Sequence, residues 1–229
     1  MEAFVVDLDS RENQSMLKPS TPPFSNQAYQ AYQVNEAAEK IHELIKNARY
    51  SNDNIVLNHN EIKEAFFSPF KPQLKNAQVF LSHSHADRNK ALEVKDYLEN
   101  QTERKVFIDS LFWDYKDDVL NKLAKHDDIS KIKDAFTLIL RESLQDMIEK
   151  CPYFVFLQSK NSVSNQGLSR ITYSAWIYEE LKIAHSISAI NESHLIPMME
   201  SMQVFHDISP FLKSFETITL NELSQQINS

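Results

Sequence analysis

Glycine occurs once in this chain of 229 residues, at Gly167, and this scarcity is the strongest constraint on what the chain can fold into and bind. At average usage a chain of this length would contain about 16 glycines. The GxGxxG and Walker A phosphate loops and the GxSxG turn of serine hydrolases each need at least two. The pattern of the EF-hand calcium loop is absent as well. Any nucleotide must therefore be bound without a glycine-rich phosphate loop.

The rest of the composition is globular and disfavours several other classes. Hydrophobic residues make up 42% of the chain, which suits one large domain or an ordinary domain with an appendage. The formal net charge of −8 disfavours a large nucleic-acid surface. Cys151 is the sole cysteine, so it forms no intramolecular disulfide and no multi-cysteine zinc site. The sequence predicts no signal peptide and no membrane span, and we expect a cytoplasmic protein that binds neither nucleic acid nor membrane.

The first third of the chain is expected to be a helical extension. Residues 1–25 contain three prolines and many small polar residues, which is typical of an irregular segment. A helix with one apolar face is expected from about Gln27 to Arg49. A shorter helix is expected to start near Asn58 or Asn60 and to end before Pro69. We therefore expect an N-terminal helical extension over residues 1–75, whose apolar face packs on the rest of the chain or on another subunit.

From residue 77 onward, short apolar runs alternate with helix-like segments. The runs cover residues 77–82, 105–110, 153–157, 194–198 and 216–220, and the helices include residues 131–150 and 176–187. This alternation predicts an α/β domain over residues 76–229, with a five-stranded parallel sheet covered by helices on both faces. Ligands bind such a sheet outside the carboxyl ends of its strands. The segments to search are therefore residues 82–88, 109–113, 159–173 and 199 onward.

Glu180 has an unusual place on its predicted helix. It lies within an apolar stripe formed by Ile177, Leu181 and Ala184. Such a carboxylate is either partly buried against the sheet or placed at the mouth of a cleft. The alternative is a glutamate at the edge of the stripe that reaches water or pairs with a lysine. Trp176 lies one turn earlier on the same side, whereas Glu179 projects roughly 100° away and is expected to be solvated.

Two strand-end segments carry polar side chains. Residues 82–88 read Ser-His-Ser-His-Ala-Asp-Arg, which suits an anionic ligand. The His-x-His spacing of His83 and His85 could hold a metal, but no third ligand is evident and we expect none. Ser84 or Asp87 is expected to cap the following helix. Phe112 and Trp113 follow the second strand and suit either stacking on a nucleobase or core packing.

Five segments, taken in order, resemble a Toll/interleukin-1 receptor (TIR) domain. They read VFLSHSHAD, VFIDSLFW, FVFLQSKNS, SAWIYEEL and HLIPM, and the resemblance covers roughly residues 76 to 225. It is greatest to bacterial TIR proteins, including the TIR components of Thoeris-type antiphage systems. The resemblance implies a flavodoxin-like TIR fold, NAD⁺ as substrate and no separate cofactor. Enzymatic TIR domains carry a glutamate four residues after a tryptophan, which implies that Glu180, four residues after Trp176, is catalytic.

The resemblance also implies substrate-binding residues. The first-strand loop of the family contacts the dinucleotide, and its second-strand loop gates the site. The expected substrate-binding residues are Ser82, His83, Ser84, Asp109, Ser110, Trp113 and Trp176. Two departures from the family, a helical insertion at residues 115–150 and a gating loop without glycine, leave the product open.

Three classes of function fit these observations. The first is an NAD⁺ nucleosidase or ADP-ribosyl cyclase-like enzyme that self-associates through its TIR domain. Such an enzyme depletes NAD⁺ or makes a nucleotide signal for a downstream effector in antiphage immunity. The second is a non-catalytic TIR interaction module, which has no need of a glutamate at position 180, so Glu180 favours the enzyme. The third is a receiver or nucleotide-binding module, but a receiver needs clustered acidic residues at the first strand end, where this chain has Asp87 alone.

Overall fold

The computed structural model describes residues 1–18, 24–51, 54–68, 76–126, 128, 133–166, 169–188 and 205–229. The chain forms two compact units. The first comprises Met1–Ser20, Asn76–Ser110 and Gln145–Ser229, and the second comprises Thr21–Lys75 and Leu111–Leu144. Helix α6 (Asp109–Leu123) starts in the first unit, and helix α7 (Lys133–Lys150) ends in it.

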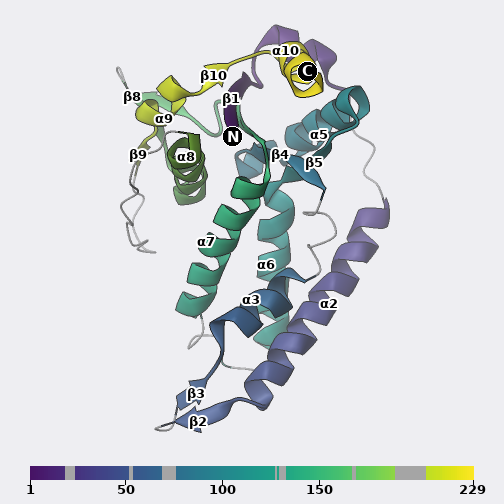
Figure 1. Ribbon diagram of the computed structural model, residues 1–229, viewed down its shortest axis with the longest axis vertical. Helices are drawn as coiled ribbons and strands as arrows, with labels where there is room; N and C mark the ends of the chain where they lie inside the picture. The colour runs from purple at the N-terminus through teal and green to yellow at the C-terminus, as the bar shows by residue number, and fades with distance from the viewer. Residues whose placement is uncertain are drawn as a thin grey trace. The chain divides into compact units, whose positions relative to one another are not determined.

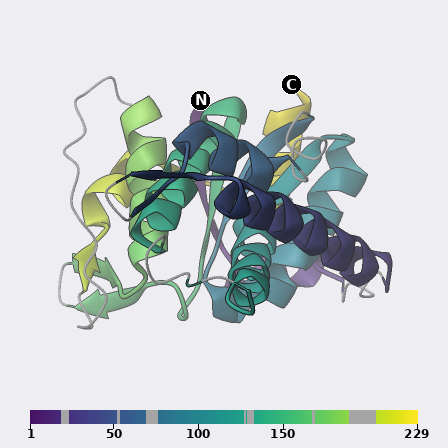
Figure 2. The ribbon, with the colours of Figure 1, turned by 90° about the horizontal axis from the view of Figure 1, so that it is seen from below.

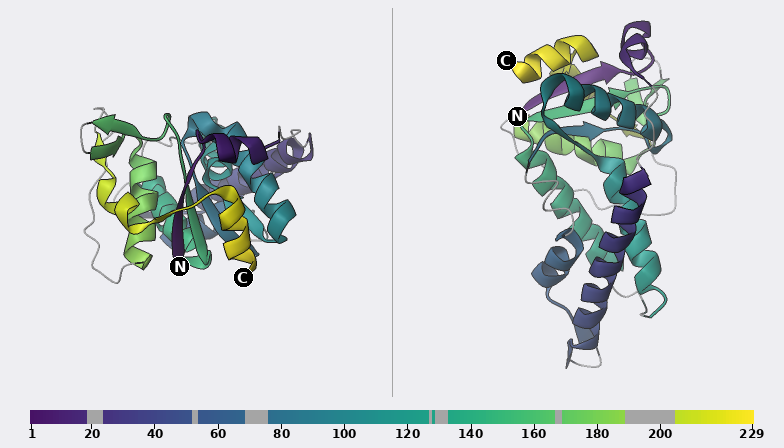
Figure 3. Two further views of the ribbon diagram at one scale, coloured as in Figure 1. Left: turned by 90° about the horizontal axis from the view of Figure 1, so that it is seen from above. Right: turned by 90° about the vertical axis from the view of Figure 1, so that its right-hand side faces the viewer.

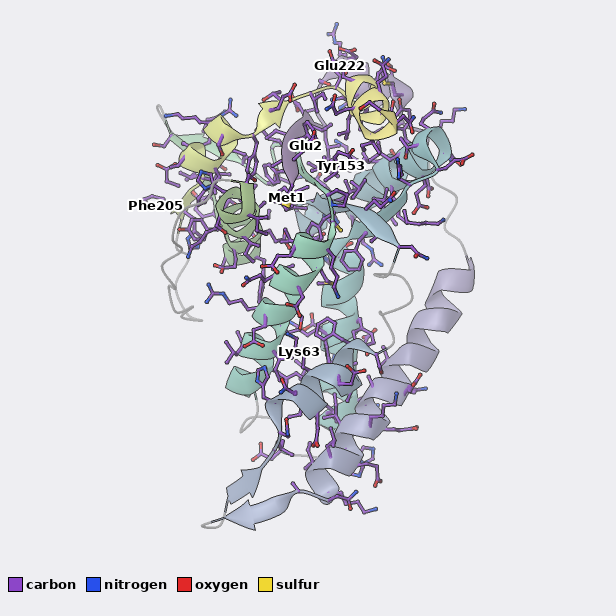
Figure 4. The ribbon with its side chains drawn as sticks, viewed as in Figure 1. Met1, Glu2, Lys63, Tyr153, Phe205 and Glu222 are labelled. Carbon is purple, nitrogen blue, oxygen red and sulfur yellow. The ribbon has the colours of Figure 1, made fainter. Side chains whose placement is uncertain are left out.

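The first unit is built on a five-stranded parallel sheet with the strand order β10-β1-β6-β4-β5 (Figure 1). The strands are β1 (Glu2–Asp7), β4 (Ala77–Ser82), β5 (Lys105–Ile108), β6 (Tyr153–Gln158) and β10 (Glu216–Thr217). The pairing of β1 with β6 begins at Glu2 and Tyr153, which lie next to each other in Figure 4. The predicted α/β class with a five-stranded parallel sheet is thus confirmed, and the arrangement is of the flavodoxin-like kind.

Helices cover both faces of this sheet (Figure 3). Helices α1 (Arg11–Met16), α5 (Arg88–Thr102) and α10 (Leu220–Asn228) lie on one face, and α8 (Ala175–Ser188) lies on the other. The core between them is aromatic and aliphatic: the rings of Phe80 and Phe154 stack at 5.7 Å, and Leu98 and Leu181 are fully buried. A short antiparallel sheet of β7 (Ser164–Gln166), β8 (Ser169–Thr172) and β9 (His206–Asp207) and the helix α9 (Ser209–Ser214) complete the unit.

The N-terminus contradicts the expectation of an irregular segment. Residues 2–7 form β1, an interior strand in which Val5 and Val6 are buried, and Ser10 begins α1 by accepting a hydrogen bond from the Asn13 backbone N–H. The prolines that motivated the expectation start at residue 19, beyond both elements. The two compact units share the predicted boundary between residues 75 and 76 and differ from the predicted division at two other places. Residues 1–20 belong with the sheet, and residues 111–144 belong with the helical unit.

The other predicted elements differ from the observed ones mainly at their ends. Strand β4 has the predicted bounds, β5 stops at Ile108 because α6 starts at Asp109, and β10 has two residues. The predicted strand at residues 194–198 lies outside the described residues. Helices α5, α7 and α8 lie where periodicity placed them. Helix α6 was expected only as part of the helical insertion at residues 115–150, and α9 and α10 were not predicted.

The second unit contains the two helices that were predicted for the extension. Helix α2 (Phe24–Lys46) packs beside α3 (His59–Phe67), with the hairpin β2 (Arg49–Ser51) and β3 (Asn54–Val56) between them in the chain (Figures 1 and 2). Asn58 caps α3, as expected, by accepting from the backbone N–H groups of residues 60 and 61. Phe66 packs edge-on against Tyr115, whose hydroxyl donates to the Phe66 carbonyl at 2.8 Å. On α2, the apolar residues Val34, Ala37 and Ile41 are buried, and the helix packs on α3.

Strand β5 is an edge of the sheet, and side chains of α5 occupy the backbone groups on its outer side. Lys95 Nζ donates to the Val106 carbonyl at 2.9 Å, and the Val106 N–H donates to Glu99 Oε1 at 3.0 Å. Lys95 and Glu99 also form an ion pair with each other. Both backbone groups of Val106 are therefore satisfied without a further strand, which is one way in which proteins protect a sheet edge.

Candidate functional site

Three of the predicted site segments meet at the carboxyl end of β4. Ser82 is the last residue of β4, Asp109 is the first residue of α6 directly after β5, and Glu180 lies in the second turn of α8. Ser82 Oγ donates to Glu180 Oε2 at 2.6 Å, and His83 Nε2 lies 3.1 Å from Asp109 Oδ1. We call this set the buried polar cluster; its members are Ser82, His83, Asp109, Ser110 and Glu180.

The sheet register explains why these residues meet. Leu81 of β4 is paired with Ile108 of β5, so the residues after each strand emerge at the same level. Strands β4 and β6 are neighbours in the sheet, but the chain continues from β4 to β5 on one side and from β6 to β10 on the other. The place between the ends of β4 and β6 is therefore the topological switch point of the sheet. Open α/β sheets bind ligands at that point, outside the carboxyl ends of the strands. Helix α8 contributes Glu180 because its stripe of Ile177, Leu181 and Ala184 is buried in the same unit.

The cluster is shielded from water and incompletely hydrogen-bonded. Glu180 is 0% exposed, Ser110 1%, and His83 and Asp109 3% each. Within the described part of the chain, four polar atoms of the cluster make no hydrogen bond: Ser110 Oγ, Glu180 Oε1, and the facing pair His83 Nε2 and Asp109 Oδ1, which lie 3.1 Å apart. An unsatisfied buried polar atom costs about 1–3 kcal/mol. Four such atoms together are therefore expected to receive a proton, a water or a polar ligand group.

Burial and mutual repulsion govern the charge of the two carboxyl groups. Burial raises the pKa of Glu180 well above its usual value, and the neighbouring Asp109 raises it further, while the Ser82 hydrogen bond opposes the shift. Burial also raises the pKa of Asp109, against the opposing effects of His83 and of backbone N–H donors. Two buried carboxylates in contact do not both ionise readily. The pKa of Glu180 is raised more clearly than that of Asp109, because burial and the neighbouring carboxyl group both oppose its ionisation.

A second polar group links the ends of β4 and β6. Asp87 accepts hydrogen bonds from Asn161 Nδ2 at 2.7 Å and from Ser159 Oγ. The expected helix caps were wrong, because neither Ser84 nor Asp87 makes a side-chain capping hydrogen bond. The carboxylate of Asp87 is instead used by the loop after β6. Sequence reasoning included Ser159 and Asn161 in a segment to search but gave them no role.

The remaining predicted residues have varied surroundings. Ser84 takes part through its backbone carbonyl, which lies 2.7 Å from His83 Nδ1. Trp176 is half-buried in the first turn of α8. Trp113 lies in α6, but its side chain is outside the described residues. The structure thus brings Ser82, His83 and Glu180 together with Asp109 and Ser110.

Glu179 and Cys151 are both buried. Glu179, which was expected to be solvated, is 5% exposed, because α8 packs against β1, β8 and α9 over more than one stripe of its surface. Cys151 is buried, and burial raises the pKa of its thiol to about 12. Such a thiol stays protonated and fits a structural role.

The described residues offer neither a metal-binding cluster nor a membrane-spanning helix. That part of the chain contains no group of three or more His, Cys, Asp and Glu side chains placed to hold a metal ion. His85, the second histidine of the His-x-His pair, is exposed, while His83 faces Asp109. None of the helices, as far as they are described, is long and apolar enough to span a membrane.

The second unit has a groove between α2 and α3 with a volume of about 1260 Å³. Leu44 and Ile62 contribute apolar surface to it, and four glutamates take part in its lining: Glu39, Glu43, Glu61 and Glu64. None of the predicted site residues lines this groove, so it is separate from the buried polar cluster.

The first unit is thus an α/β domain with a buried polar cluster at the switch point of a parallel sheet. Comparisons with models of protein families, with curated proteins and with solved structures find no match to this chain. The resemblance to TIR domains therefore stays a prediction based on five sequence segments.

Proposed function

We propose that this protein is a TIR-domain enzyme that cleaves the bond between nicotinamide and ribose in NAD⁺. The observation that carries this proposal is the convergence of Glu180 with Ser82, His83 and Asp109 in one buried cluster. The TIR resemblance assigned these residues to one active site, although they come from three separate segments of the chain. Their meeting at the switch point of the sheet supports an active site there.

The chemistry of the reaction suits a single carboxylate. Breaking the bond gives a ribose with oxocarbenium character, as in glycoside hydrolysis. The bonding electron pair goes to the ring nitrogen, so nicotinamide leaves as a neutral molecule and needs no general acid. Glu180, once ionised, would stabilise the positive charge that develops on the ribose. Ser82, which donates to Glu180 at 2.6 Å, would hold that carboxylate in position.

The buried state of Glu180 sets a condition on activity. Its side chain is fully buried among the described residues, so substrate reaches it when part of the covering structure moves. We propose that self-association through the TIR domain provides the active arrangement. Exclusion of water from such a site would favour cyclisation or exchange over hydrolysis. The product would then be a nucleotide signal, read by a downstream effector in antiphage immunity.

The test is mass spectrometry of NAD⁺ incubated with the purified protein, with and without lysate from phage-infected cells. Glu180→Gln is expected to lower the cleavage rate by about 10² or more, because it removes the charge and keeps the shape. Asp96→Asn makes the same chemical change at an exposed position of α5 and should leave the rate unchanged. Equal rates for the wild type and Glu180→Gln would refute the proposal. Absence of cleavage under all conditions would favour the non-catalytic interaction module.

A further inference from the structure

We propose that the groove between α2 and α3 binds a basic amphipathic helix of a partner protein. The groove has a volume of about 1260 Å³, and both helices that form it belong to the second unit. This inference goes beyond the proposed function, because it concerns an interaction surface and does not depend on NAD⁺ cleavage.

The first argument is the length and the apolar surface of the groove. Helices α2 and α3 pack side by side (Figure 1), and the lining covers more than one turn of each, from Glu39 to Leu44 and from Asn60 to Ala65. Leu44 and Leu57 are half-buried, so they present apolar surface to an incoming group. The volume exceeds the roughly 300–1,000 Å³ of small-molecule pockets. An amphipathic helix binds such a groove by laying its apolar face along it.

The second argument is the charge of the groove. Four glutamates and one lysine line it, so its charged side chains sum to −3. The lysine is Lys40, whose Nζ lies 2.6 Å from Glu36 Oε1, a carboxylate outside the lining. Neither Glu39 nor Glu61 forms an ion pair with another described residue. The groove therefore combines apolar surface with negative charge that its own lysine does not balance.

The third argument is the distribution of the glutamates over both helices. Glu39 and Glu43 are four residues apart on α2, and Glu61 and Glu64 are three residues apart on α3, so each pair shares one side of its helix. All four side chains are exposed. A helix bound in the groove would therefore meet carboxylates on both of its flanks. Its apolar residues at i, i+3, i+4 and i+7 would contact the apolar lining, and its lysines or arginines would reach the carboxylates.

A second copy of this chain suits the groove less well than a basic partner. The chain has a formal net charge of −8, so a second copy would bring further negative charge to an acidic groove. Like charges across an interface oppose association, whereas opposite charges speed the encounter and select the partner. Charge complementarity thus favours a positively charged segment, and the apolar lining requires that this segment also has an apolar face.

The experiment measures binding of a fluorescently labelled synthetic helix to the full chain by fluorescence anisotropy. The probe is a peptide of about 15 residues with leucine at i, i+3, i+4 and i+7 and lysine elsewhere. One comparison peptide has glutamate in place of every lysine, and a second keeps the composition but spreads the leucines around the helix. We expect the probe to bind at least about tenfold more tightly than either comparison peptide, and to bind less tightly as salt is raised.

Two variants assign the binding to the groove. The triple variant Glu39→Gln, Glu43→Gln and Glu61→Gln removes three negative charges from the lining and keeps the size of each side chain. It should weaken binding of the probe about tenfold, through the loss of exposed ion pairs with the lysines. Leu44→Gln should weaken binding about fivefold, because it replaces half-buried apolar surface with a polar side chain of similar size.

The matched control neutralises three exposed acidic residues of the first unit, in the triple variant Glu12→Gln, Asp96→Asn and Glu216→Gln. It changes the net charge by the same amount and leaves the groove intact, so it should bind the probe as the wild type does. Circular dichroism verifies that each variant is folded. Sedimentation velocity without peptide reports whether copies of the chain associate through the groove.

Every outcome bears on the inference. Absence of probe binding, equal binding of either comparison peptide, or equal affinities of the groove variant and the control variant would overturn it. A wild-type dimer that the groove variant converts to a monomer would assign the groove to a second copy, and would overturn it too. None of these measurements involves NAD⁺, so the groove and the proposed enzyme stand or fall separately.

Discussion

Replacing Glu180 by glutamine is expected to make the protein more stable than the wild type as pH rises. In the unfolded chain a glutamate has a pKa of about 4.3. In the folded protein, burial and the adjacent Asp109 raise the pKa of Glu180 well above its usual value. Between these two values the folded state binds one proton more than the unfolded state, so the stability of the wild type falls with rising pH. Glutamine does not titrate, and the variant escapes this loss.

The magnitude follows from the number of protons involved. One extra proton in the folded state lowers the unfolding free energy of the wild type by about 1.4 kcal/mol per pH unit. For a chain of this size, that difference amounts to roughly 3–5 °C in Tm for each pH unit. The contact with Ser82 should survive the substitution, because the glutamine carbonyl can accept from the Ser82 hydroxyl. The gap between the two proteins should therefore open from about pH 5 upward and stop growing where Glu180 ionises.

The assay is urea unfolding of the wild type, Glu180→Gln and Asp96→Asn at pH 5, 6, 7 and 8. Asp96 is exposed, so its variant should follow the wild type at every pH. Parallel curves for the wild type and Glu180→Gln would show that Glu180 titrates normally and would refute the raised pKa. A variant that becomes less stable than the wild type with rising pH would reverse the sign and refute it as well.

Three further outcomes are expected. Asn13→Ala should lower the unfolding free energy by about 2–4 kcal/mol in urea titrations, because Asn13 accepts from the Leu220 N–H at 2.9 Å and donates to the Asp7 carbonyl at 2.8 Å. The control Asn100→Ala, at an exposed site, should change the unfolding free energy little. Cys151 should react with a thiol reagent at pH 8 when the protein is unfolded and not when it is native, since the thiol is buried and its pKa is about 12. Deletion of residues 1–8 should give an aggregating protein in size-exclusion chromatography, because it removes the interior strand β1; a soluble, folded product would show that the sheet does not need this strand.

The elements that could be predicted from the sequence are those whose apolar residues form a clear run or a regular helical stripe. Strand β4 is a continuous apolar run, and α8 has a regular apolar stripe, so both were located closely. Strand β1 was missed because the prolines from residue 19 onward dominated the interpretation of the first 25 residues. The start of helix α6 was missed because the helix begins directly after β5, without a loop to mark the change. Tertiary packing, and not local preference, decides such cases.

The candidate site was predictable in its residues but not in its charges. The strand-end rule and the TIR resemblance pointed to Ser82, Asp109 and Glu180, and these side chains lie together. The raised pKa of Glu180 could not be predicted from the sequence, because it depends on the burial of two carboxyl groups from distant segments. The burial of Glu179 was missed for a similar reason: a single helical stripe does not reveal how many neighbours surround a helix.

The occupied edge of β5 restricts the directions in which copies of this protein can be joined. An added strand would have to displace Lys95 and Glu99 from both backbone groups of Val106. The opposite edge of the sheet is β10, which has two residues and offers little length for pairing. Continuous intermolecular sheets are thereby disfavoured at both ends. Copies of this protein are therefore less suited to joining through the two edges of the five-stranded sheet than through the helix and loop surfaces around it.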